Sequence, residues 1–240
     1  AKANMMVCSK SMINVATRMQ QRWNIPYFEG SFYGISDMST TLREIARLLV
    51  QTGAPADLID RAEALITVEE ARAWERIRAY KQRLTGKKVL LITGGVKSWS
   101  VVSALQEAGL EVVGTSVKKS TKEDKAKIKE IMGDDAHMID DMTPRQMYAM
   151  LREAKADIML SGGRSQFVAL KARMPWMDIN QERHQAYAGY EGMVTMIAEI
   201  DKALFNPVWA QVRTPAPWDV VDPLLVEQDA AVLASEAQPA

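Results

Sequence analysis

A continuous apolar strand that leads through a glycine turn into a helix is the feature that most constrains the fold. Residues 89–92 (VLLI) are apolar at every position, as expected of a strand buried on both faces of a parallel sheet. Gly94 and Gly95 turn the chain, residues 98–108 carry apolar side chains at helical spacing, and Gly109 precedes a strand at 111–117. This order is a βαβ unit, which predicts a parallel sheet.

Strands and helices alternate along the rest of the chain. We expect further strands at residues 5–7, 27–28, 137–139, 157–160 and 176–179, with helices between them. Asp37 or Ser39 is expected to cap the helix that ends near Gly53, and Ser120 with Glu123 has the spacing of a capping box. The fold class is therefore α/β, with Rossmann-like parallel-sheet units.

The same reading divides the chain into segments. Residues 1–56 are predicted to be the C-terminal part of a truncated Rossmann-like domain, because Ala1 leads directly into an apparent strand. Residues 57–86 are predicted to form a helical connector, whose charges of both signs are typical of a solvated face. Residues 87–205 are predicted to form a second Rossmann-like domain. Residues 206–240, rich in Pro, Ala, Glu and Gln, are predicted to be an extended, partly disordered tail.

Composition excludes several classes of function. The 30 basic and 30 acidic residues balance, so no basic field indicates nucleic acid. The single cysteine excludes an intrachain disulfide framework and fits a reducing cytoplasm. With two histidines the chain cannot supply the usual four nitrogen and sulfur ligands of a zinc site. No apolar run approaches the ~20 residues of a membrane span.

Cys8 follows the first predicted strand, where ligands often bind in α/β proteins. A thiol at this position is a packed small hydrophobe, a nucleophile or a metal ligand, and the burial typical of free cysteine favours packing. The residues alone leave these alternatives open.

Glycines and cations follow two other predicted strands. Gly94, Gly95 and Lys97 form one such turn, and Gly162, Gly163 and Arg164 form the other. Backbone N–H groups at a helix start, with a cation beside them, suit an anion. The alternative is that the glycines only permit tight turns. The glycine fingerprints of dinucleotide and P-loop sites are absent.

A polar stretch follows the last predicted strand, at residues 178–184. Its position makes it a candidate site, although a lone histidine such as His184 is more often solvated than catalytic. Gly189 and Gly192 indicate either a positive φ or a close approach of backbone. No hydrolase signature is present.

Several stretches of the chain resemble the nitrogenase component 1 family. They are residues 7–12 (VCSKSM), 24–26 (NIP), 28–34 (FEGSFYG), 94–100 (GGVKSWS), 178–183 (DINQER), 187–192 (YAGYEG) and 206–209 (NPVW). The resemblance covers nearly the whole chain up to about Trp218. Within the family it is closest to the α-like subunit of the scaffold that assembles the iron–molybdenum cofactor, and it implies that the chain is the C-terminal half of a longer subunit.

The resemblance implies a role for each candidate residue. Cys8 falls where the catalytic α subunit binds an end iron of its cofactor, and soft sulfur suits iron–sulfur clusters. Asn180 falls, to within one position, where that subunit has a histidine ligand to molybdenum. Gly94 and Gly95 match glycines whose N–H groups approach the cluster. Lys97 falls where that subunit has an arginine, and Arg164 lies near the position of a lysine on its homocitrate side. Their positive charge suits an anionic cluster and homocitrate.

The function implied is that of an assembly scaffold and not primarily an enzyme. It would hold an iron–sulfur–carbide precursor while the nitrogenase Fe protein supplies molybdenum and homocitrate, then pass the cofactor to the catalytic nitrogenase protein. Its implied partners are NifN, in an α2β2 heterotetramer, and a donor of the precursor cluster, in the cytoplasm. A second iron–sulfur cluster is implied in the missing half.

Other functions stay open. The chain could belong to a catalytic nitrogenase α subunit or a related oxidoreductase, although Asn180 disagrees with the histidine expected there. It could be a nucleotide-binding dehydrogenase, against which the missing glycine fingerprint counts. It could also bind nothing by itself.

Overall fold

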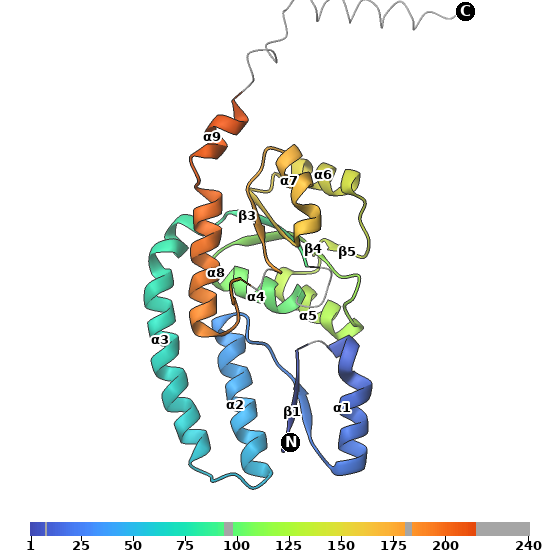
Figure 1. Ribbon diagram of the computed structural model, residues 1–240, viewed down its shortest axis with the longest axis vertical. Coiled ribbons are helices and arrows are strands. Elements are labelled where there is room, and N and C mark those ends of the chain that lie inside the picture. Colours follow the sequence, from blue (N-terminus) through green and yellow to red (C-terminus); the bar gives the residue numbers. More distant parts are fainter. Residues whose placement is uncertain (8, 94–97, 181–183, 215–240) are drawn as a thin grey trace, which may run out of the picture. The chain divides into compact units, whose positions relative to one another are not determined.

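The structure, a computed structural model, describes residues 1–7, 9–93, 98–180 and 184–214, without the side chains of residues 9–11 and 98 (Figure 1). The chain divides into two units, residues 1–205 and 206–240. Helices α1 to α8 and strands β1 to β7 belong to the first unit.

The first unit contains a five-stranded sheet with the strand order β5-β4-β3-β6-β7. Its strands are β3 (Lys88–Ile92), β4 (Glu111–Ser116), β5 (Met138–Ile139), β6 (Ile158–Ser161) and β7 (Trp176–Asp178). Neighbouring strands are parallel, and Val89 lies opposite both Val112 on β4 and Ile158 on β6. The α/β class and the parallel sheet predicted from the sequence are confirmed.

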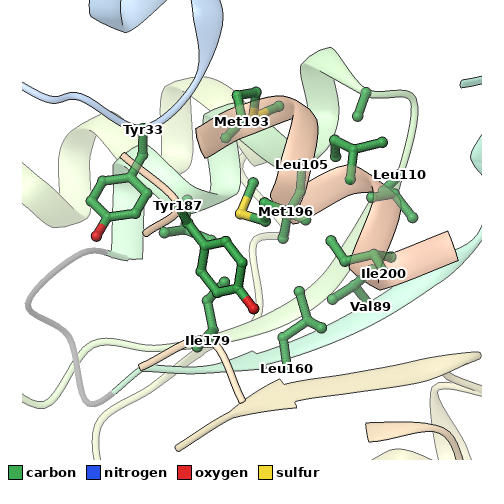
Figure 2. Close-up of a cluster of buried hydrophobic side chains, with 14 of the residues drawn as sticks. Tyr33, Val89, Leu105, Leu110, Leu160, Ile179, Tyr187, Met193, Met196 and Ile200 are labelled. Carbon is green, nitrogen blue, oxygen red and sulfur yellow. The ribbon is translucent and has the colours of Figure 1, made fainter. Parts of the chain in front are cut away.

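Helices cover both faces of this sheet (Figure 1). On one face Val89 and Leu91 pack with α4 (Ser98–Glu107) and α8 (Gly189–Leu204), and Figure 2 shows side chains of this core. On the other face Leu90 packs with α6 (Pro144–Glu153) and α7 (Gln166–Lys171). All three strand side chains are 0% exposed, which explains why consecutive residues of β3 are apolar.

A smaller parallel sheet comes earlier in the chain. β1 (Asn4–Met6) pairs with β2 (Tyr27–Glu29), so that Met6 lies opposite Glu29. The helices of this region are α1 (Ser9–Trp23), α2 (Ile35–Gln51) and α3 (Leu58–Leu84). Helix α3 packs against α2 and α8 and buries Ala73 and Ile77 in the core. The helix predicted as a connector is thus part of that core.

The start of α2 differs from the prediction. The helix begins at Ile35, and neither Asp37 nor Ser39 caps it. Glu107, at the end of α4, takes this role. Its Oε2 accepts the N–H of Ile35 at 2.8 Å, and its Oε1 accepts the N–H of Ser36 at 2.9 Å. A carboxylate at a helix N-terminus satisfies free N–H groups and interacts favourably with the positive end of the helix dipole. No local sequence pattern indicates that another helix supplies this carboxylate.

The capping box predicted for α5 (Lys122–Met132) is wrong by one residue. The box is formed by Thr121 and Asp124, not by Ser120 and Glu123. The Thr121 hydroxyl accepts the N–H of Asp124 at 3.1 Å, and the Asp124 carboxylate accepts the N–H of Thr121 at 2.8 Å. Two overlapping candidates with the same spacing made the register ambiguous.

In the second unit, the extended conformation predicted after residue 205 is wrong for Val208–Arg213, which form α9. Pro207 is its N-cap residue, and Asn206 Oδ1 accepts the N–H of Val208 at 3.0 Å. This Asn-Pro start is a local helix signal that composition alone does not reveal. Among the described residues, no helix is both long and apolar enough to cross a membrane.

Candidate functional site

Apart from Cys8, the candidate residues follow neighbouring strands of the five-stranded sheet. Ile92 at the end of β3 lies opposite Ser161 on β6, and Ser161 lies opposite Asp178 on β7. The segments after these strands therefore start side by side at the carboxyl edge of the sheet, where α/β proteins bind ligands. Gly94, Gly95 and Lys97 follow β3 but lie outside the described residues.

The segments after β6 and β7 touch through glycines. A Cβ atom on Gly162 would lie 2.9 Å from Asn180 Nδ2, and one on Gly163 would lie 3.3 Å from Asp178 Oδ2. The Asn180 N–H donates to Asp178 Oδ1 at 2.8 Å, which stabilises the turn after β7. The glycine pair thus permits a close approach that larger residues would obstruct.

Arg164 and Asn180 are consequently brought to the same edge of the sheet. Arg164 lies in the short 3₁₀ helix η1 (Gly163–Ser165), and both side chains are exposed. At the end of β6, the indole N–H of Trp176 donates to Ser161 Oγ at 2.8 Å and links β7 to β6. An exposed guanidinium and an exposed amide at one edge of a sheet can each donate hydrogen bonds to an anionic ligand.

Cys8 lies outside the described residues, so its side chain is not placed. The strand expected before it is β1, which ends at Met6, and helix α1 begins at Ser9. Within the described ranges, no group of three or more His, Cys, Asp or Glu side chains is arranged to hold a metal ion.

The start of helix α8 shows why the sequence has glycines there. Gly189 has a φ of +86°, and its N–H donates to Phe32 O at 2.7 Å. A Cβ atom on Gly192 would lie 2.5 Å from the carbonyl carbon of Tyr187. The positive φ and the close approach predicted from the sequence are therefore both present. Burial raises the pKa of Tyr187, which Figure 2 shows in the core beside this helix.

The sequence did not predict the partners of two residues that it singled out. Ser39, expected to cap α2, instead hydrogen-bonds the Tyr190 hydroxyl of α8 at 2.7 Å. Trp99, in the first turn of α4, donates to Glu29 of β2. The contacts of Ser39 and Trp99 join segments far apart in the chain, so no spacing in the sequence could indicate them. His184, which the sequence did not favour as a catalytic group, is exposed.

Residues 1–205 match the family of nitrogenase component 1 type oxidoreductases. The chain belongs to this family. The match covers the whole first unit, including both parallel sheets and the candidate residues.

Members of the nitrogenase component 1 family with similar sequences carry a common name. The nitrogenase iron-molybdenum cofactor biosynthesis protein NifE of Bradyrhizobium diazoefficiens is 70% identical over 221 residues, which are 92% of this chain and 40% of that protein. The NifE of Klebsiella pneumoniae is 48% identical over 218 residues, 91% of this chain and 47% of that protein. The chain thus spans less than half the length of these relatives.

A solved structure of the nitrogenase component 1 family has the same fold. Nitrogenase Cp1 at pH 5 superposes with a TM-score of 0.77 over 91% of this chain and 49% of that chain, at 22% sequence identity. At this identity the likeness shows the fold alone.

Proposed function

We propose that this chain is the C-terminal half of a scaffold subunit that builds the nitrogenase iron–molybdenum cofactor. The observation that carries the proposal is the 70% identity over 92% of the chain with a protein named for iron-molybdenum cofactor biosynthesis. The substrate would be an iron–sulfur–carbide precursor cluster, held while molybdenum and homocitrate are inserted. Because the relatives are more than twice as long, the activity belongs to the longer protein.

The candidate residues suit this substrate. A Cys8 thiolate would bind an iron, because soft sulfur is the preferred ligand of iron–sulfur clusters. The backbone N–H groups of Gly94 and Gly95 would approach the cluster sulfurs, and Lys97 and Arg164 would offset the negative charge of the cluster and of homocitrate.

Asn180 would distinguish a scaffold from a catalytic subunit. An amide is a poorer metal ligand than an imidazole, so the site would have one strong protein ligand at Cys8 and none at the molybdenum end. We expect Asn180→His to retain the molybdenum-bearing cofactor more tightly and to transfer it more slowly. The rate of transfer to cofactor-free catalytic protein measures this, and an unchanged rate would count against Asn180 as the replaced ligand.

The proposal extends to the rest of the assembly. The full subunit would pair with NifN in an α2β2 heterotetramer in the cytoplasm, with a second iron–sulfur cluster in its N-terminal half. It would accept the precursor from a donor protein and meet the Fe protein and the catalytic protein in turn. Residues 1–56 would complete a Rossmann-like domain together with the preceding part of the longer chain.

The direct test uses the full-length complex, purified without oxygen from cells that lack the catalytic nitrogenase protein. We expect it to contain the precursor cluster by iron analysis and electron paramagnetic resonance. After incubation with Fe protein, molybdate and homocitrate, it should activate cofactor-free catalytic protein. A complex that reduces nitrogenase substrates by itself would favour the alternative, a catalytic α subunit or a related oxidoreductase.

A further inference from the structure

Helix α7, which covers one face of the five-stranded sheet, carries apolar side chains on both of its own faces (Figure 1). Val168 and Ala169 are 2% and 0% exposed and pack in the same core as Leu90 of β3. On the opposite side of the helix, Phe167 is 55% exposed and Leu170 is 51% exposed. Because buried side chains already fill the core face, the exposed pair is not required to hold α7 on the sheet.

Two cations flank this exposed pair. Arg164, in η1, precedes Phe167 by three residues, and Lys171 follows Phe167 by four, so the side chains share one side of the η1–α7 segment. Both cations are exposed, and in the part of the chain that the structure describes neither forms an ion pair with a carboxylate. Arg164, Phe167, Leu170 and Lys171 are here named the α7 patch.

An exposed apolar residue of α3 has different surroundings. Leu65 is 52% exposed, much like the apolar pair of α7. The cations on either side of it in the helix pair with carboxylates, Arg61 with Asp57 at 3.3 Å and Arg72 with Glu69 at 3.0 Å. Isolated exposed apolar residues are normal, whereas an apolar pair between unpaired cations has the composition of a docking surface for an acidic partner.

The α7 patch begins at the carboxyl edge of the five-stranded sheet. Arg164 follows Ser161, the last residue of β6, by three positions, and Asn180 lies at the same edge. A partner bound to the patch would therefore lie beside the residues that the proposed function assigns to the substrate. Four side chains can form the centre of a small, transient interface, whereas permanent subunit interfaces are larger and more apolar.

We infer that the α7 patch docks the catalytic nitrogenase protein while it receives the finished cofactor, through a face of that protein on which carboxylates surround an apolar side chain. The inference rests on the proposed function, in which Arg164 offsets the negative charge of the cluster and of homocitrate. A guanidinium that pairs with a carboxylate of the incoming protein is no longer free to pair with the bound substrate. Docking thus weakens the hold on the substrate, which suits the protein that removes the cofactor and not the donor that delivers the precursor.

The experiment uses the full-length complex with its partner subunit, loaded with finished cofactor by incubation with Fe protein, molybdate and homocitrate. The probe is cofactor-free catalytic protein, whose binding rate and affinity are measured directly. Phe167→Ser should weaken binding by about tenfold or more, because large side chains at the centre of an interface carry much of its binding energy. Leu65→Ser is its matched control, since it removes an equally exposed apolar side chain from α3 and should leave binding unchanged.

The cationic rim is tested by the dependence of association on salt. Lys171→Glu should slow association about tenfold at low salt and reduce the effect of added salt, because it reverses a charge that attracts an acidic partner. Lys202→Glu, on α8, is the control, since the Lys202 side chain is 75% exposed and lies outside the patch. It should change neither the association rate nor its salt dependence.

The results distinguish failure of the inference from failure of the proposed function. If the wild-type complex never activates cofactor-free catalytic protein, the proposed function fails and the inference fails with it. If the wild type transfers its cofactor but Phe167→Ser and Lys171→Glu bind the probe like their controls, the inference alone is overturned.

Two other results would assign the α7 patch to a different occupant and so overturn the inference. If the two α7 variants do not assemble with the partner subunit while the controls do, the patch is covered within the complex. If they bind the catalytic protein normally but lose binding of the Fe protein or of the precursor donor, the patch docks that protein instead.

Discussion

The two parallel sheets of the first unit both arise from alternating strands and helices, but they differ in how fully helices cover their faces. Strand β3 lies between two other strands with helices on both faces, and Leu90 is 0% exposed. Within the described part of the chain, the small sheet consists of β1 and β2, and beside it Met12 is 51% exposed. A largely apolar groove of about 330 Å³ lies there, lined by residues of β1 and α1. Local patterns determine strands and helices, whereas burial depends on distant neighbours.

The largest difference should appear when a large side chain is truncated in each region. Leu90→Ala should lower the free energy of unfolding by about 2–5 kcal/mol, because it leaves a cavity in the core of the five-stranded sheet. Met12→Ala, beside the small sheet, should change it by less than about 0.5 kcal/mol. Urea unfolding followed by circular dichroism measures both. Equal losses would show that the β1–α1 region is as tightly packed as the larger sheet.

A smaller effect should follow from cutting a contact between the two regions. Glu107→Ala removes the carboxylate of α4 that caps α2, which should cost about 1 kcal/mol. The control is Glu111→Ala, since Glu111 is exposed and its pair with Lys88 spans 3.8 Å. That change should cost less than about 0.5 kcal/mol. If urea unfolding gives the same loss of free energy of unfolding for both variants, the Glu107 cap does not stabilise the contact between α4 and α2.

The smallest effect concerns the ionisation of Asp37, on α2 beside α4. Burial raises the pKa of its carboxyl, a hydrogen bond with Ser103 opposes the rise, and the nearby Glu107 adds to it. The folded protein therefore binds this proton more tightly than the unfolded chain. This contribution to stability is full below the unfolded pKa of about 3.9 and is lost as the pH rises through the higher folded pKa.

Asp37→Asn removes this dependence. The stability of the wild type relative to the variant should fall as the pH rises above about 4, as measured by urea unfolding at each pH. A difference that stays constant, or that grows in favour of the wild type, would contradict the raised pKa.

Much of the fold could be predicted because its signals are local. The apolar run at residues 89–92, the glycines of α8 and the alternation of strands and helices each depend on neighbouring residues. The proximity of Asn180 to Gly162 could also be predicted, because both residues follow predicted strands of the same sheet.

What the sequence could not indicate are contacts between distant segments. Glu107 caps a helix whose first residue lies 72 positions earlier. Glu29 contacts Trp99 and Lys127, which lie 70 and 98 positions away in the chain. Such contacts are decided by how the helices pack on the sheets, which periodicity does not encode.

The most direct test of the proposed scaffold function is the iron content of the full-length complex carrying Cys8→Ala. We expect the variant to assemble with its partner subunit, to keep the second iron–sulfur cluster, and to lose most of the precursor cluster, because the proposed thiolate ligand is gone. Iron analysis and electron paramagnetic resonance of the purified complex distinguish the two clusters. A variant with the wild-type amount of precursor and an unchanged signal would contradict the account.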